Sequence, residues 1–229
     1  MLEKLKQDVY EANIALVKYG LVRLTWGNVS AIDRIAGYIV IKPSGVEYDI
    51  MKPEDMVVVD MDGKVVSGNY KPSSDTATHL ELYRQFEDIG AVVHTHSTWA
   101  TIMSQIGKSL PAFGTTHADY FADNIPCTRD MRDAEITCNY EHETGKVIVE
   151  AFVGINPLDI PAVLVKNHGP FTWGINAKKA VENAFVLEEV AKMAYYTQNA
   201  LANTPEMPKV LLHKHFYRKH GDGAYYGQD

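Results

Sequence analysis

The chain contains several apolar runs of only three to five residues, each bounded by residues that favour turns. Runs of this length suit buried strands, because helices in globular proteins are usually longer. Asp62 and Gly63 separate two of the runs and indicate a hairpin. The pattern therefore predicts strands at residues 38–41, 56–60, 64–66, 89–93, 146–149 and 162–165.

Longer segments repeat apolar residues at helical spacing. The first sixteen residues do so, and further helices are expected at residues 76–86, at 98–106 and after Asn176, which would cap the last of them. Because strands and helices alternate and several connections are short, we expect a mixed α/β (α+β) fold with a mainly antiparallel sheet flanked by helices. No linker of proline, glycine and serine divides residues 1–229, which should form a single domain.

Composition excludes several classes of function. The net charge of −7 disfavours non-specific nucleic-acid binding, although backbone amides could still bind a small anion locally. No run of about 18 apolar residues is present, so no membrane span is expected. The N-terminal residues do not resemble a secretion signal and the two cysteines are too few for a disulfide framework, so we expect a cytoplasmic protein.

Two histidines one residue apart, His94 and His96, follow the apolar run at residues 89–93. Side chains at positions i and i+2 of a strand point to the same side, so the two imidazoles would converge at the strand end. His168 follows the run at 162–165 in a similar way. Three such imidazoles favour a catalytic metal site with open coordination positions over unconnected polar strand ends.

Imidazole ligands favour Zn²⁺, and Mn²⁺, Co²⁺ or Fe²⁺ could replace it. Asp75 is a further candidate ligand, since it stands after two serines at the expected start of the 76–86 helix. Its carboxylate could bind the metal or could only cap the helix, and the residue type alone leaves both interpretations open.

Eight segments match motifs of one known family. They are residues 24–30 (LTWGNVS), 41–46 (IKPSGV), 71–76 (KPSSDT), 93–97 (VHTHS), 114–120 (GTTHADY), 168–171 (HGPF), 219–221 (KHG) and 224–228 (AYYGQ). The chain resembles the class II aldolase/adducin-like family from end to end, and within it the L-ribulose-5-phosphate 4-epimerases. The members of L-ascorbate catabolism are more similar than those of L-arabinose catabolism. The resemblance implies a class II aldolase-like fold.

The same resemblance implies roles for twelve residues. Zinc would be held by Asp75, His94, His96 and His168. The phosphate of a small pentulose phosphate would be bound by Gly27, Asn28, Ser44, Gly45, Ser73 and Ser74. The acid–base pair would be Asp119 and Tyr226. Taken singly, the glycine-containing segments could also be no more than turns.

The position of Tyr226, three residues from the end of the sequence, has a consequence for assembly. A chain terminus is usually mobile unless it docks, and a cleft between subunits would let it dock. The resemblance implies a cyclic homotetramer with active sites at the subunit interfaces. His215 and Arg218 could assist Tyr226 or belong to a solvated tail, and Lys42 could support the phosphate pocket or only flank a turn.

The chemistry of a 4-epimerase explains why such residues are needed. The hydrogen at C4 of a 2-ketopentose phosphate is not acidic, so breaking the C3–C4 bond is easier than removing that proton. A metal chelated by the C2 and C3 oxygens would stabilise the resulting enediolate. The aldehyde fragment would then turn while its phosphate stays anchored, and two acid–base groups would serve the two faces of O4.

Two other functions compete with epimerisation. The first is a zinc-dependent aldolase acting on phosphates of the fuculose or rhamnulose type. Aldolases that resemble the chain place a glutamate where Asp75 stands, and the shorter Asp75 suits a ligand better than a proton-transfer residue. The second is a non-catalytic interaction module like the adducin head, against which the intact metal and acid–base positions argue.

Overall fold

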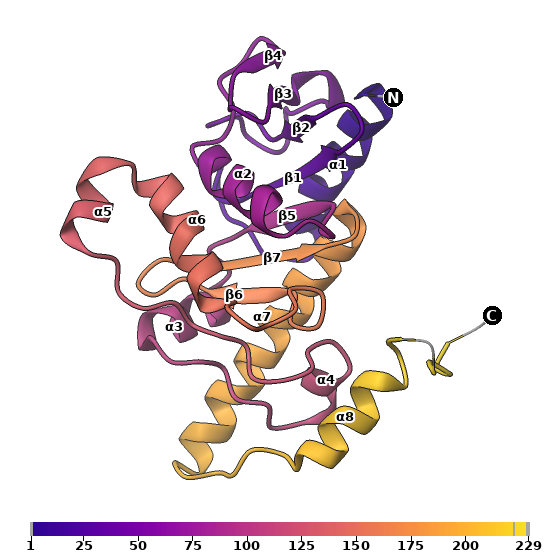
Figure 1. The fold of residues 1–229 in the computed structure, drawn as a ribbon, viewed down its shortest axis with the longest axis vertical. Helices are drawn as coiled ribbons and strands as arrows, with labels where there is room; N and C mark the ends of the chain where they lie inside the picture. Colours follow the sequence, from indigo (N-terminus) through magenta and orange to yellow (C-terminus); the bar gives the residue numbers. More distant parts are fainter. Residues whose placement is uncertain (1, 222, 228–229) are drawn as a thin grey trace.

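One seven-stranded sheet forms the centre of the computed structural model, which describes residues 2–221 and 223–227 (Figure 1). Its strand order is β4-β3-β2-β1-β5-β7-β6. The predicted domain of residues 1–229 includes Met1, and the predicted 224–228 motif includes Gln228. Both of these residues lie outside the described part of the chain. The strands are β1 (Asn28–Asp33), β2 (Tyr38–Ile41), β3 (Val57–Asp60), β4 (Val65–Ser67), β5 (Ala91–His94), β6 (Ala162–Leu164) and β7 (Pro170–Gly174).

Every pairing between these strands is antiparallel, which confirms the expected sheet. In the centre, β5 pairs with β1 on one side and with β7 on the other. The register sets His94 opposite Asn28 of β1 and opposite Phe171 of β7. The last residue of β5 therefore lies between the first residue of β1 and the start of β7.

Helices cover both faces of the sheet, because alternate strand residues point to opposite sides. In β2, Ile39 and Ile41 belong to one buried cluster and Val40 belongs to another. Residues of α2, α3 and α6 share the first cluster, and residues of α1 and of the start of α7 share the second. The helices are α1 (Leu2–Lys18), α2 (Thr76–Gln85), α3 (Thr98–Ile106), α4 (Thr115–Ala118), α5 (Asp133–Cys138), α6 (Tyr140–Ala151), α7 (Ala177–Ala200) and α8 (Lys209–Tyr217), with a 3₁₀ turn at Pro53–Asp55.

The four helices expected from apolar spacing are all present as α1, α2, α3 and α7. The predicted cap of α7 is confirmed, since the Asn176 side chain accepts a hydrogen bond from the Lys179 backbone N–H at 2.9 Å. None of the described helices combines the length and apolar character needed to cross a membrane.

The strand predicted at residues 146–149 is wrong, because this segment lies inside α6. Its valines and isoleucine favour strands locally, but Thr144, Val147 and Ile148 are buried at helical spacing. A side chain at Gly145 would collide with Glu81, since a Cβ there would lie 2.6 Å from that of Glu81. Close packing against α2 thus overrides the local strand preference.

The C-terminal segment includes α8, which was not among the four predicted helices. This helix packs on the short helix α4, and both lie at the end of the molecule away from β4 (Figure 1). Leu212 and Phe216 are the buried residues of α8. The pairing of α4 with α8 determines where the Asp119 segment meets the C-terminal residues.

Candidate metal centre and phosphate pocket

Three imidazoles converge at one edge of the sheet. His94 ends β5, His96 follows it by two residues, and His168 lies in the turn between β6 and β7. Their ligating nitrogens all lie within 4.8 Å of one another. His94 is buried, His168 is half-buried and His96 is exposed, so the cluster opens toward solvent on the side of His96. The convergence predicted from the sequence is confirmed.

The turn that carries His168 is held by local geometry. The Val165 backbone N–H donates to the Gly169 carbonyl at 3.0 Å, and Asn167 adopts a left-handed conformation with φ of 61°. Asparagine tolerates this conformation better than most residues. Because β7 then pairs with β5, the turn places the His168 ring 4.7 Å from the His94 ring, centroid to centroid.

The histidines fit a metal ion in orientation and spacing. His94 Nδ1 lies 3.0 Å from the Pro170 carbonyl, which can only accept, so Nδ1 donates and Nε2 is the nitrogen that faces His96. His94 Nε2 lies 3.1 Å from His96 Nε2. Two imidazole nitrogens bound to one tetrahedral zinc lie ~3.3 Å apart, given Zn–N bonds of about 2.0–2.1 Å.

The third imidazole is held by a neighbouring tyrosine. His168 Nδ1 lies 3.2 Å from the Tyr140 hydroxyl, which can fix the orientation of the ring. Burial, reinforced by the charges of His94 and His96, lowers the pKa of His168 to about 3. The imidazole is therefore neutral at physiological pH, which is the form that binds metals.

Asp75 stands at the N-cap position of α2, but its side chain makes no capping hydrogen bond. Its Oδ2 instead accepts a hydrogen bond from Asn28 Nδ2 at 2.6 Å. Burial opposes ionisation, yet His94, His79 and the Asn28 hydrogen bond together hold the pKa of Asp75 below its usual value. Asp75 is not within the compact three-histidine group, so its role as a fourth ligand stays a prediction.

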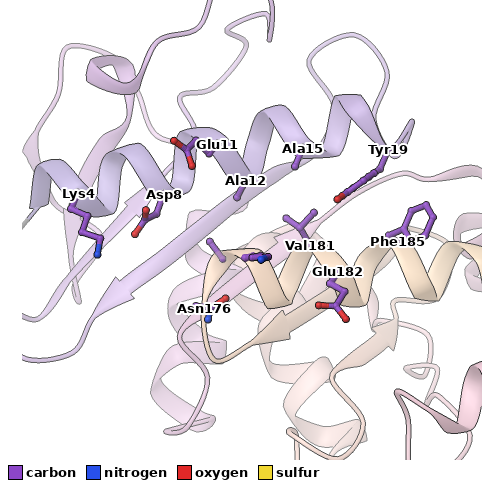
Figure 2. Close-up of a pocket in the computed structure, with 12 residues that line it drawn as sticks. Lys4, Asp8, Glu11, Ala12, Ala15, Tyr19, Asn176, Val181, Glu182 and Phe185 are labelled. Atoms are coloured by element: carbon purple, nitrogen blue, oxygen red, sulfur yellow. The ribbon is translucent and has the colours of Figure 1, made fainter. Parts of the chain in front are cut away.

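All ten residues predicted to bind metal or phosphate line one cavity of about 620 Å³. Residues that the sequence did not assign to the site also line it, including Tyr140 and Glu141 at the start of α6. The mistaken strand at 146–149 concealed them, since a helix there is what brings Tyr140 to His168. A larger cavity of about 730 Å³ lies between α1 and α7 (Figure 2), but no histidine lines it among the described residues.

Backbone amides make part of this cavity suitable for an anion. Within the described residues, the N–H groups of Gly27, Gly45 and Ser74 have no protein acceptor. The N–H groups of Ser44 and Ser73 are already used, because they donate to the Lys71 and Lys42 carbonyls. These serines could contact an anion only through their hydroxyls. Free amides in turns form anion-binding concavities, which fits the predicted phosphate pocket.

Glycine is required at position 27. Gly27 has a φ of +78°, and a Cβ there would lie 2.8 Å from a Val22 methyl carbon and 2.9 Å from the His94 carbonyl oxygen. Any side chain would therefore strain the turn and push against the strand end that carries the metal ligand. The turn and the metal centre are thus packed directly against each other.

The Asn28 side chain offers a different hydrogen-bonding group from the one that phosphate binding requires. Both hydrogens of its side-chain amide are used, because Nδ2 donates to Asp75 Oδ2 and to Ser73 Oγ. Its Oδ1 is buried without a partner in the described part of the chain. The Asn28 side chain therefore offers an acceptor for a hydroxyl group rather than a donor for phosphate.

The predicted acid–base residues lie together but outside this cavity. Asp119 follows α4 and accepts hydrogen bonds from Arg218 at 2.9 Å and from His215 at 3.0 Å. The Lys219 ammonium lies 3.2 Å from the same carboxylate and 4.5 Å from the centroid of the Tyr226 ring. Arg218 and His215 thus bind Asp119, which the sequence did not predict.

Asp119 is ionised in this setting. Burial opposes the charge, but hydrogen bonds from Arg218, His215 and Lys219 outweigh it and hold the pKa of Asp119 below its usual range. The exposed Tyr226 ring has the Arg218 guanidinium 4.8 Å from its centroid. This basic cluster is a second chemical centre of the chain, separate from the histidine cavity.

Three histidines at one edge of an antiparallel sheet, beside free amides, could hold a divalent metal next to an anion. Residues 7–195 match the family described as Class II Aldolase and Adducin N-terminal domain, and the chain belongs to that family. Enzymes of this family are typically dependent on divalent metals, and the three histidines could bind such a metal.

Solved structures agree with this assignment. An L-fuculose 1-phosphate aldolase is 28% identical, with a TM-score of 0.78 over 92% of this chain and 95% of that one. YgbL from Escherichia coli is 26% identical, with a TM-score of 0.73 over 93% and 97% of the two chains. L-Fuculose-1-phosphate aldolase from Thermus thermophilus is 22% identical and shares the fold, with a TM-score of 0.69 over 88% and 99%.

Replacing one candidate ligand should remove the metal. We expect the wild-type chain to bind one Zn²⁺, and His168→Asn to bind it more than about 100-fold more weakly, because losing a ligand costs more than losing an outer-shell contact. Competition with a chromophoric chelator measures the affinity. His213→Asn is the matched control, since His213 is exposed on α8. Equal zinc affinities for the two variants would exclude His168 as a ligand.

Proposed function

We propose that this protein is an L-ribulose-5-phosphate 4-epimerase, which interconverts L-ribulose 5-phosphate and D-xylulose 5-phosphate. The observation that carries the proposal is the shared cavity, in which three converging imidazoles lie beside free backbone amides. Such a cavity suits a substrate with a chelating hydroxyketone at one end and a phosphate at the other. Breaking and re-forming the C3–C4 bond inverts C4 without removing its non-acidic hydrogen.

A divalent metal held by His94, His96 and His168, with Asp75 as fourth ligand, would act as a Lewis acid toward the oxygens at C2 and C3. We favour zinc, because imidazole ligands prefer it. The Asn28 Oδ1, which has no protein partner in the described residues, would accept a hydrogen bond from a substrate hydroxyl.

The phosphate anchor explains how the aldehyde fragment can turn without escaping. The N–H groups of Gly27, Gly45 and Ser74 would hold the phosphate, with the Ser44 and Ser73 hydroxyls as further donors. Rotation of the aldehyde fragment about this anchor would present the other face of its carbonyl to the enediolate. Re-addition then gives the C4 epimer.

Proton transfer at O4 needs two groups, and we assign it to Asp119 and Tyr226 of a neighbouring subunit. Neither residue lines the histidine cavity of its own chain, and Tyr226 is exposed. A cyclic homotetramer would place the Asp119 cluster of one subunit against the cavity of the next. Asp119 would accept the O4 proton from one epimer, and Tyr226 would serve the opposite face.

A zinc-dependent sugar-phosphate aldolase is the second candidate, supported by the similarity to an L-fuculose 1-phosphate aldolase. Asp75 favours the epimerase, because its side chain is shorter than the glutamate of the aldolases and it lines the same cavity as the three imidazoles. Cytoplasmic pentose use, in L-ascorbate rather than L-arabinose catabolism, is the setting we propose. A non-catalytic adducin-like role would leave the three histidines without a task.

The reaction itself can be tested with purified protein. We expect L-ribulose 5-phosphate to be converted to D-xylulose 5-phosphate in a coupled assay, and a chelator to abolish this conversion until zinc is restored. Free glycolaldehyde phosphate should not accumulate. Net release of an aldehyde faster than epimer formation would contradict the epimerase and favour the aldolase.

The shared active site can be tested by mixing two inactive variants. Asp119→Asn should retain zinc and His168→Asn should lose it, and each should be nearly inactive alone. In mixed tetramers formed from equal amounts of the two variants, about a quarter of the interfaces would join an intact metal site to an intact Asp119, so activity should recover to about a quarter of wild type. No recovery after verified subunit mixing would show that Asp119 does not act across the interface.

A further inference from the structure

Tyr48 contacts the Trp26–Gly27 turn of the phosphate pocket from outside the cavity. Its side chain is buried, and its hydroxyl hydrogen is shared between the carbonyl oxygens of Trp26 at 3.0 Å and Gly27 at 2.9 Å. Within the described residues no other group donates to either carbonyl. Tyr48 does not line the cavity itself, so its hydroxyl acts on the turn and not on a ligand.

The planar peptide gives this contact a direction. In a trans peptide the C=O and the following N–H point to opposite sides. Holding the Trp26 carbonyl toward Tyr48 therefore turns the Gly27 N–H away from Tyr48. This N–H has no protein acceptor in the described chain, and Gly27 lines the cavity. The Tyr48 hydroxyl thus keeps a free donor available to the pocket.

Lys42 holds the carbonyl groups of a second turn of the pocket, the one that contains Gly45. Its ammonium donates to the Val46 carbonyl at 2.8 Å and to the Pro43 carbonyl at 3.3 Å, so it ties together both ends of the turn that contains Gly45. The same ammonium lies 4.7 Å from the centroid of the Tyr48 ring. Lys42 is only 2% exposed, and burial lowers its pKa to about 8. A charge buried this deeply needs such partners.

We propose that Tyr48 is a positioning residue of the phosphate pocket, whose hydroxyl fixes the Gly27 turn and whose ring seats the Lys42 ammonium that fixes the Gly45 turn. This inference rests on the proposed function, because its task is to orient amides for a phosphate. One tyrosine then sets the relative placement of two turns that are separated in the sequence and line the same cavity. Loss of the hydroxyl would free one turn and leave the ring and Lys42 in place.

Tyr48→Phe tests this role in the full-length zinc-loaded protein. We expect glycerol 3-phosphate, measured by titration calorimetry, to bind about fivefold more weakly, as the loss of one hydrogen bond implies. KM for L-ribulose 5-phosphate should rise by a similar factor, with little change in kcat and in zinc content. Amide hydrogen exchange should accelerate at Trp26, whose N–H donates to the Arg23 carbonyl at 3.0 Å.

Tyr83→Phe is the matched control, because Tyr83 is also a buried tyrosine but its hydroxyl contacts Ser30 and neither turn. It should leave phosphate affinity and the exchange of the Trp26 amide unchanged. Wild-type affinity in Tyr48→Phe, or equal loss in both variants, would overturn the role of Tyr48 while leaving the pocket intact. Failure of the wild-type protein to bind glycerol 3-phosphate would instead contradict the phosphate pocket, and with it the task assigned to Tyr48.

Discussion

The candidate site depends on the antiparallel pairing of β5 with β1 on one side and β7 on the other. The register sets Asn28 and Phe171 opposite His94, so three chain segments meet at one edge of the sheet. His168 lies three residues before Phe171 and is brought to His94 by the same pairing. Backbone hydrogen bonds therefore fix the spacing of the imidazoles, and a metal would find its ligands already in place.

The chain carries two chemical centres of different electrostatic character. The cavity presents imidazoles and amide N–H groups, whereas the second centre gathers Arg218, His215 and Lys219 around Asp119. The net charge of −7 gives no hint of this basic cluster. In the proposed enzyme, each active site would combine the cavity of one subunit with the Asp119 cluster of the next, so catalysis would require assembly. The anionic substrate would then lie between donors from both subunits.

The parts of the site that follow local rules could be predicted from the sequence. Strand ends and turn residues indicated His94, His96 and His168, and helical spacing indicated four of the helices. The strand at 146–149 was mispredicted because the contact of Gly145 with Glu81 is visible only in three dimensions.

Contacts between distant segments could not be predicted from local patterns. Arg218 binds Asp119 across 99 residues of sequence, and no periodicity connects such positions. The Tyr48 hydroxyl likewise contacts carbonyls about twenty residues earlier in the chain. Backbone partners of this kind have no sequence signature, since any residue has a carbonyl. Both contacts arise from packing of the finished fold.

We propose above all that His94, His96 and His168 together bind one catalytic metal. X-ray absorption spectroscopy at the zinc edge of the purified, zinc-loaded protein tests it most directly. The three-histidine site predicts three imidazole nitrogens and remaining oxygen ligands, at about 2.0–2.2 Å from zinc. A zinc ion with a sulfur ligand, or with fewer than three imidazoles, would contradict the claim.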